Sequence, residues 1–109
     1  MATDKEYLNF IFEQLSELEE GTVRARSMMG EYVLYYKDKI VGGIYDNCLL
    51  IKNVESARKF IKDAVYEIPY KGAKEMILIS DLDDKIFLKR LFEEIYDELP
   101  KGKAPKNKK

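Results

Sequence analysis

The sequence predicts a two-layer α+β domain in which helices cover one face of an antiparallel sheet, with the element order α-β-β-β-β-α-β-α. Three observations predict this class. Apolar residues recur at helical spacing near both ends of the chain. Between them lie short runs rich in β-branched and aromatic residues, separated by turn residues. Strands joined by such short turns pair in antiparallel fashion, and 109 residues suffice for one domain.

The first helix is expected over about residues 4–18, with Gly21 as its stop. Its polar face includes Glu13 and Gln14, which we expect to face solvent. Thr3 followed by Glu6 three residues later predicts a capping box at its start. Its apolar face is formed by Leu8, Ile11, Phe12, Leu15 and Leu18.

The middle of the chain predicts strands with period-two alternation of side chains. Residues 37–39 and 46–47 are the expected turns, and residues 28–30 interrupt the first two strands. Alternation places Tyr32 with Leu34 on one face but does not say which face meets the helices. The expected strands are 22–27, 31–36, 40–45 and 48–52.

The last part of the chain predicts a helix over 54–64, a loop or edge segment at 68–70, an apolar strand over 75–79 and a final helix that ends at Pro100. Candidate caps are Asn53 or Ser56 for the former helix and Ser80 or Asp81 for the latter.

With the helices on one face, the other face of the sheet is expected to lack cover within the chain. Its Tyr and aliphatic residues would form an exposed apolar patch. We therefore expect a homodimer through this face or through an edge strand, or a protein partner.

Charge divides the chain into a folded domain over 1–100 and a tail over 101–109. The tail (KGKAPKNKK) holds five lysines and no acid, and we expect it to be disordered. Removing these five from the 19 basic residues leaves 14 against 20 acidic ones, a charge of −6 on the domain. Such a domain repels phosphates, so we expect no nucleic-acid partner except through weak binding by the tail. The tail is either a solubilising segment or a binding arm.

Composition excludes several classes of site. Histidine is absent and Cys48 is the one cysteine, which rules out histidine-dependent triads, thiolate-rich zinc sites and iron–sulfur clusters. We expect no enzyme activity, no cofactor and no metal. A single cysteine, no apolar run of membrane-spanning length and no visible export signal favour a cytoplasmic location without a membrane.

Two segments carry candidate binding residues. Arg24 and Arg26 on one side of a strand can clamp a carboxylate or phosphate, although pairing with Glu19, Glu20 or Glu31 is the more ordinary role. A Gly pair inside a strand indicates a bulge, a bend or a close approach. We expect a pocket between the sheet and the first helix to be formed by Arg24, Arg26, Gly30, Gly42 and Gly43. Met29 and Tyr32 join them as candidate residues for binding a ligand or partner.

Two other features have ordinary explanations. The acids at 81–84 lack the glycine and the distal glutamate of a calcium loop and suit a helix N-terminus. Cys48 follows a turn and precedes Leu49, and nothing near it predicts a lowered pKa, so we expect an inert thiol.

The runs RSMMGEY at 26–32 and KIVGGIYD at 39–46 resemble the N-terminal domain of the TfoX/Sxy family, and the resemblance continues to the final helix. Met29 stands where many members have Phe. The resemblance covers about residues 4–99 and implies a small α+β domain, a regulatory role in competence and transcription, and no established catalytic residues. Full-length members carry a second helical domain after this one.

Two functions follow as hypotheses. The first is a non-enzymatic, stand-alone TfoX N-terminal-like module that binds a protein partner in regulation. The second is a small-molecule or anion-binding domain that uses Arg24, Arg26 and the glycine-containing strands.

Overall fold

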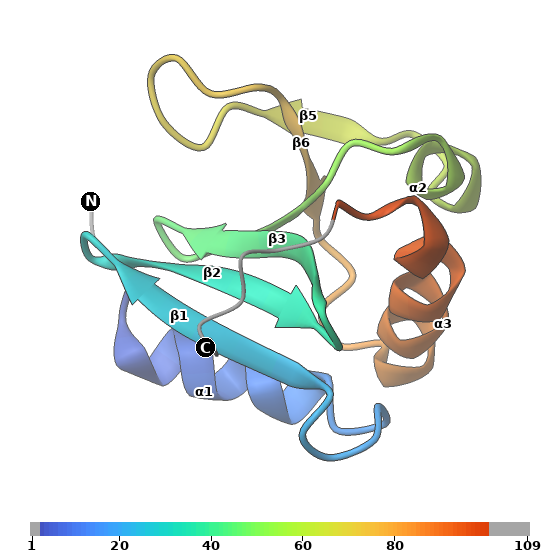
Figure 1. Ribbon diagram of the computed structural model, residues 1–109, viewed down its shortest axis with the longest axis horizontal. Helices are drawn as coiled ribbons and strands as arrows, with labels where there is room; N and C mark the ends of the chain where they lie inside the picture. The colour runs from blue at the N-terminus through green and yellow to red at the C-terminus, as the bar shows by residue number, and fades with distance from the viewer. Residues whose placement is uncertain (1–2, 101–109) are drawn as a thin grey trace.

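The computed structural model describes residues 3–100, which form one six-stranded antiparallel sheet with helices packed against one of its faces (Figure 1). The predicted fold class is confirmed. The predicted tail at 101–109 lies outside the described residues. The elements are α1 (Lys5–Gln14), β1 (Val23–Met28), β2 (Glu31–Tyr36), β3 (Lys39–Tyr45), β4 (Cys48–Ile51), α2 (Glu55–Phe60), β5 (Val65–Glu67), β6 (Met76–Ile79), α3 (Lys85–Ile95) and the 3-10 helix η1 (Tyr96–Glu98).

The strand order across the sheet is β1-β2-β3-β4-β6-β5, so β1 and β5 are its edges. β5 is a short strand that the sequence pattern did not predict, because the helical spacing of residues 54–64 extends over its approach. In the structure, α2 ends at Phe60, and Ile61 is already extended.

Side-chain alternation sorts the strands into two faces. Paired residues of antiparallel strands share a face, and Leu34, Ile44 and Ile77 are fully buried on the face that meets α1 and α3. We call this the helix face. All three helices contribute to its core, with Phe92 of α3 as the largest fully buried side chain.

The opposite face, which we call the open face, is better covered than the sequence predicted. Tyr35, Leu50 and Met76 lie on it and are nevertheless buried. The segment 68–75 between β5 and β6 passes over part of it, and the ring of Tyr70 lies 6.1 Å from that of Tyr45. The expectation of a face without cover is therefore wrong, because the β5–β6 connection supplies a partial one.

Two helix starts differ from the predictions. Thr3 does not cap α1. Its hydroxyl donates to Glu31 of β2 at 2.6 Å, and its backbone N–H donates to the carbonyl of Gly30, so it fastens the chain to the sheet instead. The final helix is capped by Asp84, which accepts from the N–H of Phe87 at 3.0 Å.

Gln14 was expected on the solvent face of the first helix but is buried, and its side chain donates to the carbonyl of Leu82 in the loop before α3. α1 also ends earlier than predicted. Leu15 and Leu18 still belong to the core, because hydrogen bonds between residues three positions apart continue the helical turns beyond Gln14. Likewise, neither Asn53 nor Ser56 caps α2, whose N-cap is Val54.

Candidate functional site

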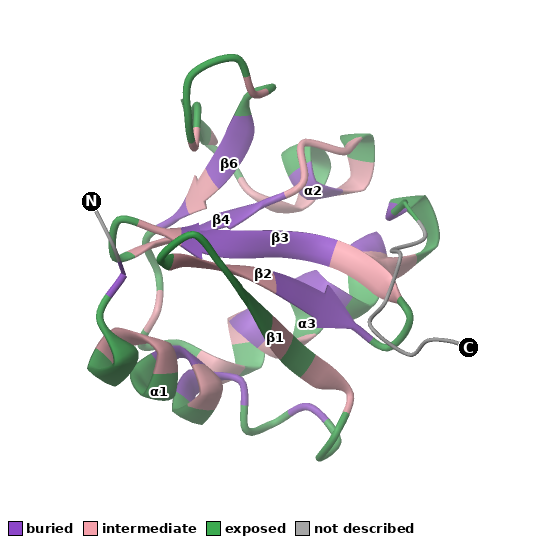
Figure 2. Cartoon of the chain, turned by 60° about the vertical axis from the view of Figure 1, so that its left-hand side comes forward, coloured by how far each residue is buried: buried purple, intermediate pink, exposed green. Residues whose placement is uncertain are grey.

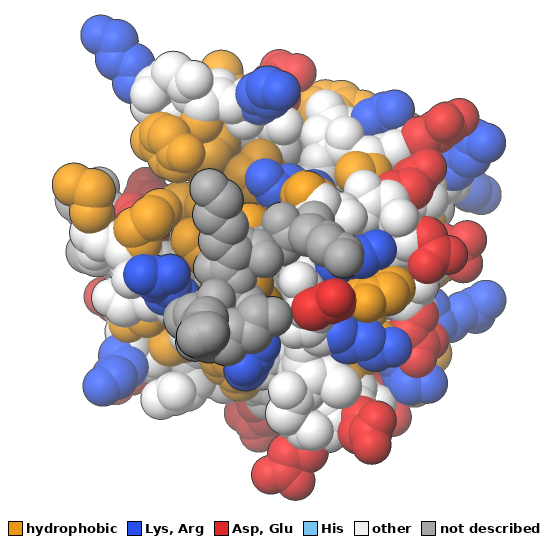
Figure 3. Space-filling model, viewed as in Figure 1, with side chains coloured by type: hydrophobic (Ala, Val, Ile, Leu, Met, Phe, Trp, Pro, Cys, Tyr) orange, Lys and Arg blue, Asp and Glu red, His pale blue; other side chains and the backbone are white. Residues whose placement is uncertain are grey.

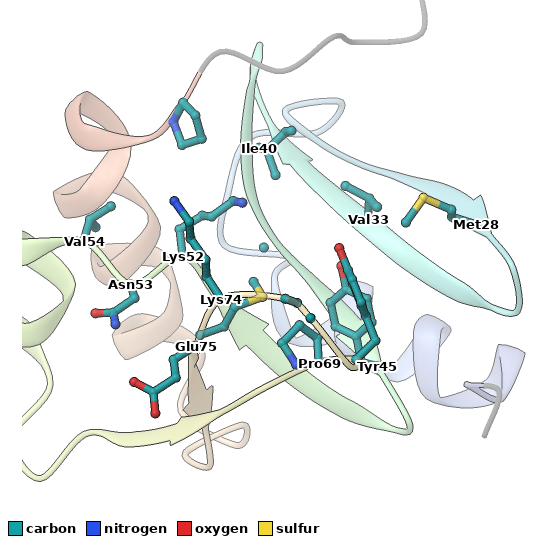
Figure 4. A pocket seen from close by; sticks show the side chains of 16 residues that line it. Met28, Val33, Ile40, Tyr45, Lys52, Asn53, Val54, Pro69, Lys74 and Glu75 are labelled. Carbon is teal, nitrogen blue, oxygen red and sulfur yellow. The ribbon is translucent and has the colours of Figure 1, made fainter.

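A groove of about 600 Å³ lies on the open face (Figure 4). Strands β1 to β3 form one wall, and segments 52–54 and 69–76 form the other. Figure 2 shows β3 buried within the sheet and β1 exposed at its edge. The groove is therefore bounded by one wall of paired strands and one wall of connecting segments.

The surface of the groove is mostly apolar and aromatic. Val33 and Ile40 project from the strand wall, and Pro69 and Tyr70 come from the opposite one. Tyr45 lies between them. Burial is the main cause that raises the pKa of its hydroxyl, and the nearby Tyr70 and Glu31 raise this pKa further by smaller amounts. In Figure 3, hydrophobic side chains gather on one part of the surface, with lysine and arginine side chains among them. A neutral tyrosine beside aliphatic carbon suits an apolar ligand with a polar edge.

Two lysines from different segments enter this groove. Lys52 follows β4 and Lys74 precedes β6, and Figure 4 shows both side chains directed into the space between the walls. Within residues 3–100 neither forms an ion pair, whereas Lys59 and Lys89 pair with acids on their own helices. Glu75 also borders the groove, with its carboxylate directed away from the two ammonium groups. With Lys52 and Lys74 against the single carboxylate of Glu75 among its charged lining residues, the groove is positive on a domain that is acidic overall.

Arg24 and Arg26 lie on the open face of β1, as their register with Tyr35 and Val33 of β2 shows. Both are exposed, at the edge of the sheet beyond the groove. The expected ion pairs with Glu19, Glu20 or Glu31 do not form within the described residues. The arginines lie on the same face of the sheet as the groove, and α1 packs against the opposite face. They therefore do not lie in the expected pocket between the sheet and the first helix.

Three of the other predicted residues lie apart from the groove. Met29 and Gly30 form the two-residue turn between β1 and β2, with positive φ angles of 53° and 87°. Met29 is 98% exposed, and the carbonyl of Gly30 accepts the N–H of Thr3. Tyr32 lies on the helix face and packs against the core.

The pair Gly42 and Gly43 has a structural explanation. Leu34 pairs with Gly42 and Tyr35 with Ile40, so Val41 is the extra residue of a β-bulge. A Cβ on Gly42 would lie 2.0 Å from the carbonyl oxygen of Leu50 on β4. One on Gly43 would lie 2.6 Å from the carbonyl oxygen of Tyr32 and 2.5 Å from the ring of Tyr45. The expected bulge and close backbone approach are confirmed, and Gly42 also borders the groove.

Sequence reasoning missed the groove residues Tyr45, Lys52, Tyr70 and Lys74. Tyr45 and Lys52 stand at or near strand ends, and the other two belong to a connection that the sequence marks only as a turn region. Their shared location depends on the path of residues 68–75 over the sheet, for which the sequence carries no periodic signal.

The thiol of Cys48 is the last of the candidate groups. The pKa of the Cys48 thiol is raised, first by burial and then by Asp46 and Glu67, which disfavours the reactive thiolate. Among the described residues no group of three or more acids and cysteines is placed to hold a metal ion. None of the helices within residues 3–100 is long and apolar enough to cross a bilayer.

Comparison with known proteins gives two matches. A family model described as the TfoX N-terminal domain matches residues 13–94. An uncharacterized 12.7 kDa protein from the trpE 5′ region of Spirochaeta aurantia is 37% identical over 82 residues, which make up 75% of this chain and 70% of that protein. No solved structure matches the chain.

Proposed function

The chain belongs to the TfoX N-terminal domain family, and from this premise we propose that it is a non-enzymatic module that binds a protein partner in regulation. The proposed docking surface is the open face of the sheet. The partner contributes a segment that combines apolar side chains with carboxylates. The matched family and the relative carry no enzyme name.

The observation that supports this proposal is the composition of the groove. Val33, Ile40 and Tyr70 offer apolar contact area, while Lys52 and Lys74 supply positive charge and form no ion pair within the described residues. Apolar area gives most of the affinity of a protein interface, and charge complementarity selects the partner and speeds the encounter. A groove with both favours an acidic and apolar segment over a basic one.

Capture and reconstitution with matched variants tests the proposal. The full chain and its Lys52→Glu variant are immobilised, and proteins captured from an extract of the source organism are identified and purified. The matched control is Lys62→Glu, which makes the same charge change at an exposed lysine outside the groove. We expect Lys52→Glu to weaken binding of the purified partner at least tenfold and Lys62→Glu to leave it within about twofold. Equal effects of both variants, or no effect of either, would refute groove docking.

A small anionic molecule is the second candidate ligand, and the size of the groove favours it. A volume of about 600 Å³ falls within the range of pockets that hold small molecules, and the two lysines suit a carboxylate or phosphate. A ligand at 100 times its dissociation constant raises the free energy of unfolding by about 2.7 kcal/mol. A thermal-shift screen of anionic metabolites therefore tests this candidate, with Lys52→Ala and Lys74→Ala as variants that should lose the shift.

A further inference from the structure

The edge strand β1 has unpaired backbone groups in a predictable pattern. The turn of Met29 and Gly30 has positive φ at both residues, which is the two-residue hairpin turn whose flanking residues, Met28 and Glu31, form a hydrogen-bonded pair. Counting back by twos, the N–H and C=O groups of Arg26 and Arg24 also bond to β2. The bond from the N–H of Lys37 to the carbonyl of Thr22 continues the same series.

The backbone groups of Val23, Ala25 and Ser27 therefore point away from β2, at the edge of the sheet. Three successive residues of this kind form a template for one further strand of about six residues. Figure 2 shows β1 at the edge of the sheet, with its residues exposed or intermediate and none buried.

The side chains of β1 define what such a strand must carry. On the open face, the added strand meets Arg24 and Arg26, which have no ion-pair partner within the described residues. Acidic residues two positions apart on the added strand lie opposite these arginines, because alternate residues share a face.

On the helix face the requirement is different. Val23 and Ala25 are half-buried against the core, and a hollow of about 340 Å³ beside Val23 is lined by Phe12 and Leu15. Glu19 and Glu20 also border this hollow. Their carboxylates disfavour an acidic residue on this face of the added strand, whereas the apolar lining of the hollow favours an apolar one.

A second copy of this chain does not complement the edge through its own β1. We consider the antiparallel β1–β1 registers in which at least two of Val23, Ala25 and Ser27 pair with these same residues of the other copy. In each of them at least one arginine lies directly opposite an arginine of the other copy. Like charges in that position are destabilising. The lysine-rich segment 101–109 carries the same sign of charge.

We infer that β1 binds an extended segment of a partner protein by strand addition, and that this segment alternates acidic residues with apolar ones. The inference rests on the proposed function in taking the ligand to be a protein, and it adds the mode of binding and the sequence pattern of the ligand. The acids contact Arg24 and Arg26, and the apolar residues cover Val23 and Ala25.

Two fluorescent heptapeptides test this inference by anisotropy titration against the full chain. The first is acetyl-Ser-Val-Glu-Val-Glu-Val-Ser-amide, and the second has lysine in place of both glutamates. We expect the glutamate peptide to bind at least tenfold more tightly, and this preference to weaken as salt rises. The double variant Arg24→Glu/Arg26→Glu should reverse the preference, a gain of binding that misfolding does not produce.

Backbone pairing has its own matched variants. The N–H of Ser27 points outward, so Ser27→Pro removes one edge donor without breaking a bond to β2. Ser27→Ala removes the hydroxyl but keeps the N–H. We expect only the proline variant to lose at least tenfold in affinity, with melting temperatures measured for both. Hydrogen exchange at Val23, Ala25 and Ser27 should slow when the glutamate peptide is added to the wild type.

The inference is overturned if the wild type binds neither peptide or binds both equally, or if a folded Ser27→Pro variant binds as the wild type does. If one of these outcomes is found while Lys52→Glu still weakens binding of the captured partner at least tenfold, the proposed function stands without strand addition. If the glutamate peptide adds to β1 while Lys52→Glu leaves partner binding unchanged, groove docking is wrong and strand addition stands.

Discussion

The substitution Gly42→Ala tests whether the glycine pair of β3 exists for packing. An added Cβ would lie 2.0 Å from the carbonyl oxygen and 2.9 Å from the carbonyl carbon of Leu50, and 2.7 Å from the Cα of Ile51. These are backbone atoms of the neighbouring strand β4, so relief requires separating two paired strands rather than turning a side chain. Overpacking of a core typically costs about 1–3 kcal/mol, and we expect the upper end here.

The size of this effect is measurable by thermal and urea unfolding followed by circular dichroism. A loss of about 3 kcal/mol is a large part of the roughly 5–15 kcal/mol that stabilises a domain of this size. It corresponds to a fall in melting temperature of about 12 °C or more.

Gly72→Ala is the matched control. Gly72 has a φ of +90°, and a Cβ there would meet no heavy atom within 4 Å. Its substitution therefore carries only the backbone cost of a left-handed residue, about 1–2 kcal/mol. If Gly42→Ala is no more destabilising than Gly72→Ala, the packing explanation for the glycine pair is wrong.

Three further predictions concern single side chains. Alkylation of Cys48 by iodoacetamide at pH 8 should be slower in the folded wild type than in the urea-unfolded chain, and Asp46→Asn should accelerate it in the folded protein. Equal rates in the folded wild type, the folded variant and the unfolded chain would contradict the raised pKa of the thiol. The hydroxyl and backbone N–H of Ser56 hold the pKa of Glu98 below its ordinary 4.5. The stability from this contact is present above pH 4.5 and lost as pH falls through the lower folded pKa. Ser56→Ala should therefore destabilise the domain at pH 7 and have no effect in acid. The same loss of stability at both pH values would contradict this role of Glu98. Gln14→Leu should cost about 1–3 kcal/mol in urea unfolding, because it leaves the part-buried carbonyl of Leu82 without its hydrogen-bond donor. Unchanged stability would show that water replaces the amide.

The strand predictions succeeded where turn chemistry and alternation agreed. Residues 31–36 were predicted as a strand with the same bounds as β2. Asp46 and Asn47 form the expected turn, both with positive φ. Such turns require residues that tolerate a left-handed backbone, and this requirement is visible in the sequence. Helix caps were predicted less well, because Thr3 and Ser56 found long-range partners in Glu31 and Glu98.

The candidate site was predicted only in part. Arg24 and Arg26 share the open face, as their spacing of two residues requires. Tyr32 pairs with Ser27, the residue next to Arg26, and therefore lies on the other face of the sheet. The lysines of the groove come from segments more than 20 residues apart, and no local pattern relates them.

The amino-acid sequence by itself determined the order of helices and strands apart from β5, the turns that join β1 to β4 and the sets of side chains that share a face. These depend on interactions between residues close together in the chain, namely backbone preference and periodic burial. Tertiary structure alone decided which face the helices cover, how segment 68–75 passes over the other and which charged groups remain unpaired. Those outcomes depend on contacts between distant segments, and their free energies are settled only when the whole domain packs.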